Sequence, residues 1–312
     1  MKTIIIINRK AGKRIFLDLY LPQVIRVLEK GNIAFRIYYT RYSGHAAVLN
    51  AKYANQLDFI TVFGGDGTIR EVIKGMAENP IPIGIIPFGT VNVLALDLGI
   101  SFNPVIAADN LVKGCLKNID VGYLNGEPFL LMVSAGIDAL AVHNVDLRAK
   151  RYLGKIAYVI SALWTAFTYR SRRVRIVLGD QGIRDRGYQL IISNSRFYGG
   201  PLRLNERASI DDGWLDVILF KKSSILDTFR LLMGVLLHIE QGMEDVAWYR
   251  SRDIRIDSRG RVKLQMDGDK APPPPARVRV KKHQLPVIVP RKYSSKDVLE
   301  VIRTVITNVL KH

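Results

Sequence analysis

The chain has 312 residues, of which 48% are hydrophobic, so it is long enough to bury a core and to form about two domains. It carries 46 Lys and Arg against 28 Asp and Glu, and this net charge of +18 favours anionic partners such as nucleic acid or anionic lipid. The single cysteine, Cys115, excludes an internal disulfide framework and a multi-cysteine zinc site, and it is typical of a reducing cytoplasm.

The first 120 residues predict alternating strands and helices. We expect strands at 3–7, 34–39, 59–63 and 83–86, and helices at 15–30, 44–55, 69–78, 91–98 and 103–113. The first strand contains a run of isoleucines, as a buried parallel strand does, and it lacks the features of a signal peptide. Alternation of this kind predicts a parallel sheet that gathers ligands at the carboxyl ends of its strands.

From Ile119 the pattern changes to short strand-like runs. They lie at 129–133, 174–178, 188–193, 215–220, 253–257, 262–266, 276–281 and 286–289, with helical insertions at 154–169 and 224–241. Four prolines at 272–275 indicate an exposed loop, because proline cannot donate to a strand ladder. The sequence therefore predicts an α/β domain at 1–120 and a mainly antiparallel β domain at 121–293.

A glycine-rich turn follows the third predicted strand. Gly64-Gly65-Asp66-Gly67-Thr68 separates that strand from the helix expected at Ile69. Glycines let backbone N–H groups approach an anion, and a helix N-terminus adds a favourable dipole, so this segment is typical of a phosphate site. Asp66 cannot bind phosphate directly, and it indicates Mg²⁺ or a donor network beside the nucleotide. The structural alternative is a tight strand-to-helix turn.

Four further motifs occur in order along the chain. They are the loop Asn8 to Gly12, the second glycine loop Ile86 to Asn92, Tyr198-Gly199-Gly200 with Asp211 to Val217, and Met266-Asp267-Gly268-Asp269. Together with the glycine-rich turn they resemble the bacterial diacylglycerol kinase and sphingosine kinase-like lipid kinases over residues 3–290. The resemblance implies an ATP-dependent lipid kinase with an α/β nucleotide-binding domain and a β-rich lipid domain. It also implies that the C-terminal helix at 294–312 packs back on the nucleotide-binding domain.

The resemblance also implies roles for individual residues. ATP would contact the loops at the strand ends, with Mg²⁺ neutralising its phosphates. The implied nucleotide residues are Asn8, Lys10, Thr40, Gly64, Gly65, Asp66, Gly67, Thr68, Ile69, Arg70, Thr90 and Asp269. Asp66 and Asp267 would be catalytic, with Asp267 the general base that takes the proton of the acceptor hydroxyl. The Asp-Gly of this motif is also a common hairpin signal.

A structural Mg²⁺ is implied at the motif around Asp212. Its ligands would be the Asp212 carboxylate and the main-chain carbonyls of Ser209 and Trp214. Hard oxygen ligands of this kind suit Mg²⁺. The expected effect of such a metal is to stiffen the domain that carries the base.

The second glycine loop departs from the family pattern. Many relatives have an acid and an arginine where this chain has Val93 and Leu96. Asp269 likewise stands where the family has a glutamate. If the missing acid recognises the lipid head group, the acceptor differs from the best-known substrates, so the lipid acceptor stays open.

Charge and apolar residues gather between 146 and 186. Ten Lys or Arg and three acids surround the uncharged stretch Ile156 to Tyr169, which is shorter than the roughly 20 residues of a membrane span. A basic, aromatic-bearing helix suits an anionic bilayer surface, and a core helix is the structural alternative. We expect a cytoplasmic protein, peripherally associated with the membrane, acting on a lipid alcohol.

Three functional classes follow from these motifs. The first is the lipid kinase. The second is an NAD kinase, which shares the glycine-rich turn but leaves the Asp212 and Asp267 motifs unexplained. The third is a basic membrane- or nucleic-acid-binding module on a kinase scaffold, and its nucleic-acid form rests on charge alone. The sequence carries no signal for an oligomeric state.

Overall fold

The computed structural model describes residues 1–9, 11, 14–76, 80–144, 172–198, 202–203, 208–222, 245–258 and 262–291. The expected helices at 154–169, 224–241 and 294–312 lie outside these residues, as does Lys10. The described part forms two compact units. The α/β unit comprises residues up to Val121, Phe197 and Tyr198, and residues 282–291; the β unit comprises the rest.

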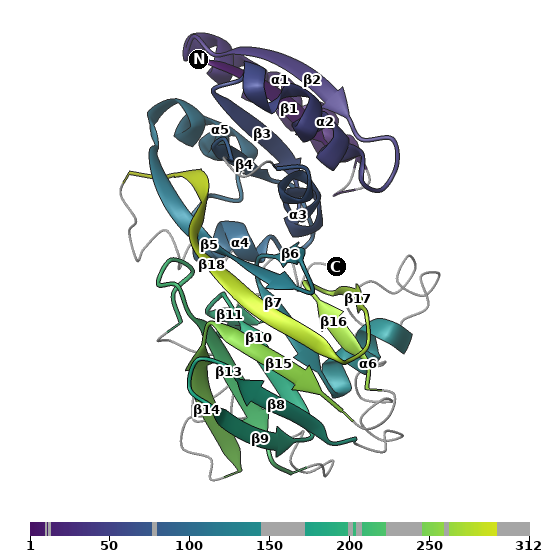
Figure 1. Ribbon diagram of the computed structural model, residues 1–312. Coiled ribbons are helices and arrows are strands. Elements are labelled where there is room, and N and C mark those ends of the chain that lie inside the picture. Colours follow the sequence, from purple (N-terminus) through teal and green to yellow (C-terminus); the bar gives the residue numbers. More distant parts are fainter. Residues whose placement is uncertain are drawn as a thin grey trace. The chain divides into compact units, whose positions relative to one another are not determined.

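The α/β unit is built on a parallel sheet in the order β2-β1-β3-β4, followed by the end of β18 (Figure 1). Its strands are almost wholly apolar because helices cover both faces. Helices α1 and α5 pack together, as do α2 and α3. The bounds are β1 Lys2–Ile7, α1 Arg14–Lys30, β2 Ala34–Tyr39, α2 His45–Tyr53, η1 Ala54–Gln56, β3 Phe59–Gly64, α3 Asp66–Lys74, β4 Ile83–Pro87, α4 Val93–Asp97, α5 Pro104–Lys113 and β5 Cys115–Leu124.

The β unit is a sandwich of antiparallel sheets. One sheet has the order β14-β13-β10-β7-β16-β17, and the other contains β18-β15-β8-β9. Alternate apolar residues of both sheets, such as Ile176, Val217 and Ile254, form its core. The bounds are β6 Glu127–Phe129, β7 Met132–Ala135, α6 Ile137–Asn144, β8 Val174–Leu178, β9 Ile183–Gly187, β10 Gln189–Ser193, β12 Leu202–Arg203, β13 Leu215–Phe220, β14 Val246–Ser251, β15 Asp253–Asp257, β16 Leu264–Met266, β17 Asp269–Ala271 and β18 Ala276–Val289. Strand β11, Phe197–Tyr198, belongs to the α/β unit.

The expected fold class is confirmed, with a parallel sheet first and antiparallel sheets second. Three local predictions were wrong. Helix α3 begins at Asp66 instead of Ile69, so most of the glycine-rich turn is its first turn. The strand expected at 129–133 is divided into β6 and β7, and the two last predicted strands are one continuous strand, β18.

Transmembrane segments were not expected. None of the helices in the described residues is long and apolar enough to cross a membrane.

Candidate active site

The loops predicted to hold the nucleotide lie at one edge of the parallel sheet. Ile7 of β1 pairs with Tyr39 of β2 and with Phe63 of β3, and Gly64 pairs with Pro87 of β4. These residues end their strands, so the segments that follow emerge side by side. Those segments contain Asn8, Thr40, Gly65 to Arg70 and Thr90.

The two glycine loops touch through their backbones. A Cβ on Gly65 would lie 3.0 Å from the Cα of Gly89, and a Cβ on Gly89 would lie 2.7 Å from the Cα of Gly65. The 2.7 Å distance leaves no room for a side chain at Gly89, and the 3.0 Å distance at Gly65 is tighter than most real Cβ contacts. At Gly67, in contrast, a Cβ would meet no atom within 4 Å. The N-terminus of α3 thus has open space beside it, as an anion site at a helix N-terminus needs.

Polar contacts fix the rest of this edge. The Asn8 side-chain amide donates to Thr68 Oγ1 over 3.0 Å, and the Asn8 N–H donates to the Phe63 carbonyl over 3.2 Å. Thr68 and Ile69 are buried, and their backbone N–H groups donate to the Gly65 carbonyl over 2.9 and 3.2 Å. Thr90 is exposed. The observed contacts place Asn8 and Thr68 together, as the sequence motifs predict for one binding surface.

Asp66 binds the start of helix α4. Its carboxylate accepts hydrogen bonds from the N–H groups of Val93, at 2.9 Å, and Leu94, at 3.1 Å. The preceding residue, Asn92, has a φ of 53° and gives α4 no side-chain cap. Asp66 therefore supplies the cap from another loop, and its charge interacts favourably with the helix N-terminus. The sequence motif did not indicate this capping role, and the predicted link from Asp66 to the nucleotide, through Mg²⁺ or a network of donors, stays a prediction.

Asn92 completes the second glycine loop. Its side-chain amide donates to the Gly89 carbonyl over 3.0 Å, and its side-chain oxygen accepts from the Gly89 N–H over 2.8 Å. The side chains of Val93 and Leu96, which replace the family's acid and arginine, are 5% and 1% exposed. An acid or an arginine would be costly in these apolar positions, so the replacements suit the local packing.

Asp267 forms the turn of a β-hairpin. Met266 of β16 pairs with Asp269 of β17, and the two residues between them, Asp267 and Gly268, have φ values of 49° and 81°. Positive φ at both positions is typical of a type I′ turn, which explains the Asp-Gly sequence. Asp269 is exposed at the start of β17.

The Asp267 carboxylate also holds the turn between β6 and β7. It accepts from the N–H groups of Leu130, Leu131 and Met132 at 2.8, 2.9 and 3.0 Å. The carboxylate draws these N–H groups away from a strand ladder, which explains why the expected strand is divided. Three N–H donors also fix the carboxylate and stabilise its negative charge.

Two buried amides, which the motif analysis missed, support this turn. Gln265 Oε1 accepts from the Gly268 N–H over 2.9 Å, and its amide donates to Ser134 Oγ over 2.7 Å. The Asn194 amide donates to the Leu130 carbonyl over 2.9 Å. Gln265 and Asn194 are 4% and 1% exposed. A polar residue within an apolar strand pattern was the available signal, because such groups are buried only with partners.

The Asp212 motif is held by arginines. Asp212 accepts from the Trp214 N–H over 2.9 Å and forms an ion pair with Arg250, whose Nε lies 3.3 Å from Asp216. Arg252 lies over the Trp214 ring at 4.2 Å. Among the described residues, no cluster of three or more His, Cys, Asp or Glu could hold a metal. Mg²⁺ binding at Asp212 would compete with the Arg250 guanidinium for that carboxylate.

The fold and these loops define an α/β kinase unit followed by a β-sandwich. Residues 2–124 match the model of the diacylglycerol kinase catalytic domain, and residues 131–289 match that of the YegS C-terminal NAD kinase beta sandwich-like domain. The chain belongs to the diacylglycerol kinase family, and it is a lipid kinase by this membership.

Individual relatives are similar to this chain over most of its length. A Bacillus subtilis diacylglycerol kinase is 26% identical over 269 residues, covering 85% of this chain and 88% of its own. A Staphylococcus saprophyticus diacylglycerol kinase is 25% identical over 95% of this chain and 98% of its own. A crystal structure of a diacylglycerol kinase from Bacillus anthracis matches 92% of this chain and 96% of its own with a TM-score of 0.75 and 26% identity.

Proposed function

We propose that this protein transfers the γ-phosphate of ATP to the hydroxyl of diacylglycerol or a related membrane lipid alcohol. The observation that carries the proposal is the backbone contact of two glycine loops beside the open N-terminus of α3. In this proposal the α/β unit binds the nucleotide and the β unit binds the lipid. The diacylglycerol kinase names of relatives that span most of the chain support the choice of acceptor.

The residues of the α/β unit would bind and orient the nucleotide. Backbone N–H groups from Gly65 to Gly67 would bind phosphate oxygens, with Asn8, Thr40, Arg70 and Thr90 around them. Asp66 would act mainly by holding the second glycine loop through α4. Mg²⁺, when bound with ATP, would neutralise charge on the phosphates.

Asp267 of the β unit would be the general base. The lipid oxygen would bond to the γ-phosphorus while the bond from that phosphorus to the bridging oxygen of ADP breaks, and the hydroxyl proton would go to Asp267. The three N–H donors orient its carboxylate for this role. Asp269, in the same hairpin, would face the nucleotide.

Incubation of the purified protein with radiolabelled ATP, Mg²⁺ and a total lipid extract tests the proposal. We expect label in the organic phase, in a product that co-migrates with a phosphorylated lipid. NAD⁺ in a parallel reaction tests the alternative kinase class. Label on NAD⁺ with none in lipid would reject the proposal, and so would ATP turnover without any lipid product.

The proposed metal at Asp212 needs its own test. Titration of Mg²⁺ without nucleotide, followed by the fluorescence of Trp214 against a Trp214→Phe reference, reports on this motif. A saturable change that Asp212→Asn abolishes would support the site. If Mg²⁺ leaves the fluorescence unchanged in the unaltered protein and in Asp212→Asn, the proposed metal site would be rejected in favour of the Arg250 ion pair.

We further propose that the protein works at the cytoplasmic surface of the membrane. Its acceptor is a bilayer lipid while ATP is soluble, so the reaction has to occur where the two meet. The net charge of +18 supports attraction to an anionic bilayer.

A further inference from the structure

One face of the β unit is dominated by arginine. In β8, β9, β15 and β18, alternate residues point into the sandwich core, and the residues between them point away from it. Nine outward positions lie within the paired part of these strands: six arginines, two aspartates and Val177. We call this surface the arginine face, and its arginines are Arg175, Arg184, Arg186, Arg255, Arg277 and Arg279.

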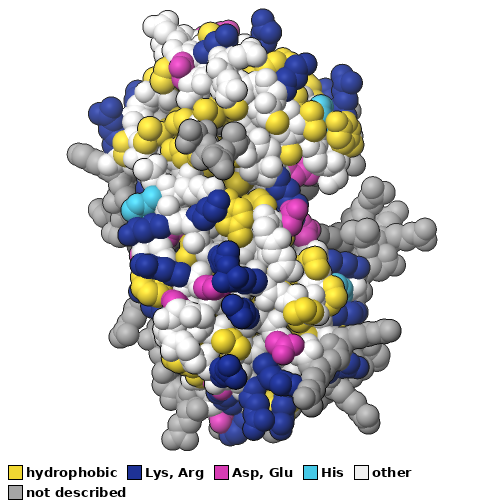
Figure 2. Space-filling model, viewed as in Figure 1, with side chains coloured by type: hydrophobic (Ala, Val, Ile, Leu, Met, Phe, Trp, Pro, Cys, Tyr) yellow, Lys and Arg dark blue, Asp and Glu magenta, His cyan; other side chains and the backbone are white. Residues whose placement is uncertain are grey.

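The arginine face is open to solvent. Five of its arginines are exposed, and Arg277 is half-buried. Figure 2 shows basic side chains spread over the surface of β8, β9, β15 and β18, with few acidic ones between them. With its two aspartates, the face carries four net positive charges.

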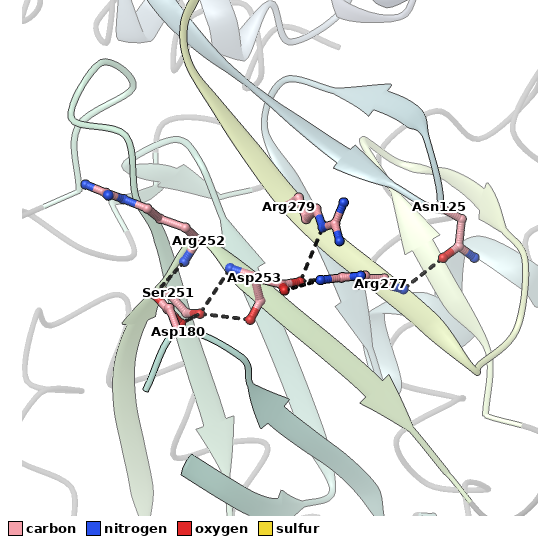
Figure 3. A network of polar contacts seen from close by, with 7 residues as sticks. All are labelled: Asn125, Asp180, Ser251, Arg252, Asp253, Arg277 and Arg279. Atoms are coloured by element: carbon pink, nitrogen blue, oxygen red, sulfur yellow. Dashed lines mark hydrogen bonds and ion pairs between the residues drawn. The ribbon is translucent and has the colours of Figure 1, made fainter. Parts of the chain in front are cut away.

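One aspartate neutralises only part of this charge. Asp253 accepts from Arg277 Nε over 2.7 Å and forms a longer ion pair with Arg279 at 3.5 Å (Figure 3). Hydrogen bonding from Arg277 lowers the pKa of Asp253, so the carboxylate is charged at neutral pH. Among the described residues, the structure gives no ion pair to Arg175, Arg184, Arg186 or Arg255.

The pairing of the strands places like charges opposite each other at two points, although Asp253 lies opposite Arg279 and Asp257 lies opposite Arg175. Arg255 lies directly opposite Arg277, and Arg175 lies directly opposite Arg186. Like charges opposite each other in neighbouring strands destabilise a sheet. These two like-charge pairs do not stabilise the folded sheet. An anion bound between their guanidinium groups would relieve the repulsion.

We infer that the arginine face docks the protein on the phosphate groups of an anionic bilayer. This inference rests on the proposed function, because a lipid kinase has to meet a membrane. Arginine suits phosphate oxygens through its planar pair of N–H donors. A sheet presents these donors on a broad surface, with strands about 4.8 Å apart, and such a surface can meet many head groups at once.

Nucleic acid fits this face less well. Single-stranded nucleic acid is bound by stacking on aromatic side chains, and none of the nine outward positions is aromatic. Reading a duplex needs an element that enters a groove, which the centre of a sheet does not provide. The arginine face is also distinct from the apolar stretch at 156–169, which the sequence alone offered as a membrane contact.

Vesicle co-sedimentation of the full chain tests the inference. The variant Arg175→Gln, Arg184→Gln, Arg255→Gln should bind phosphatidylcholine vesicles containing phosphatidylserine about 100-fold more weakly than the unaltered protein, since each basic residue at such a surface changes binding about fivefold. Lysine at the same three positions should restore most of the binding. A matched control, Lys2→Gln, Lys52→Gln, Lys74→Gln, removes the same charge from exposed positions of the α/β unit and should change binding less than about threefold.

Three outcomes would overturn the inference. The first is an equal loss of vesicle binding in the arginine-face variant and in the lysine control. The second is vesicle binding that does not change with salt concentration. The third is tighter binding of a DNA duplex or single-stranded RNA than of vesicles at equal salt. Lipid phosphorylation in detergent separates this inference from the proposed function, because the arginine-face variant should then turn over normally. A protein that phosphorylates no lipid in detergent would reject the proposed function, while the vesicle comparison would still decide the docking face.

Discussion

Replacement of Asp66 by Asn separates the structural role of this residue from its catalytic one. The carboxylate accepts two N–H groups from α4, at 2.9 and 3.1 Å. An asparagine keeps one acceptor oxygen and turns its own NH₂ group toward the other N–H, which is then left unsatisfied. That loss costs about 1–3 kcal/mol, out of a typical domain stability of about 5–15 kcal/mol. The variant should therefore fold, with lower stability.

Catalysis should fall further than stability. Displacement of α4 moves the second glycine loop, and a neutral side chain would hold Mg²⁺ beside the phosphates less well, so we expect lipid phosphorylation to drop at least about 100-fold. Urea denaturation and phosphorylation of detergent-dispersed lipid measure the two effects on the same preparation. Asp109→Asn is the matched control, because this half-buried residue of α5 forms a surface ion pair with Lys113 and its replacement should change stability by less than about 0.5 kcal/mol.

Two results would refute this reasoning. Unchanged unfolding of Asp66→Asn would show that the bonds to α4 contribute nothing. Lower stability with normal turnover per folded molecule would leave Asp66 as a helix cap and end its assignment to catalysis.

Three further predictions follow from the same structure. Asp267→Asn should abolish transfer to lipid while ATP affinity, measured by calorimetry, stays within a few-fold; a large loss of ATP affinity at an unchanged rate would instead place Asp267 on the nucleotide side. Gly89→Ala should weaken ATP binding about tenfold or more, because its Cβ would meet the backbone of Gly65 at 2.7 Å; normal affinity would contradict the loop contact. Burial, together with the hydrogen bond to Asp185, raises the pKa of Tyr249 from 10.0 to about 12, so unfolding titrations should show stability that is full below pH 10.0 and declines toward about pH 12. Tyr249→Phe should remove this alkaline decline and cost about 1 kcal/mol at neutral pH; a decline that persists in the variant would assign it to another group.

The sequence predicted the fold correctly where the run of apolar residues alone decides the local structure. Apolar runs located the ends of the parallel strands within about one residue, because a strand that is buried on both faces appears in the sequence as a continuous apolar run. Order along the chain then predicted that the loops after these strands share one edge. Residues such as Asn8 and Thr68 could be grouped in this way without any knowledge of side-chain positions.

The predictions of local structure were wrong where hydrogen bonds between residues far apart in the sequence decide that structure. The run at 129–133 is apolar and strand-like, yet three of its N–H groups bind Asp267, more than 130 residues later in the chain. The helix expected from Ile69 begins earlier because the turn residues adopt helical geometry. Strand β14, which was not predicted, places Arg250 in an ion pair with Asp212, and the metal site predicted at that motif stays a prediction.

The length of β18 sets the order in which the protein can be completed during synthesis. Its early residues pair with β15, whereas Val287 pairs in parallel with Ile83 of β4. At about 5–20 residues per second, a ribosome needs roughly 10–40 s to reach this last strand after it has made β4. Until then the edge of β4 has no partner, and an exposed apolar edge invites pairing with other chains. Nascent chains arrested before Ala276 should therefore be the aggregation-prone species of this protein, and a chaperone that covers β4 would protect them.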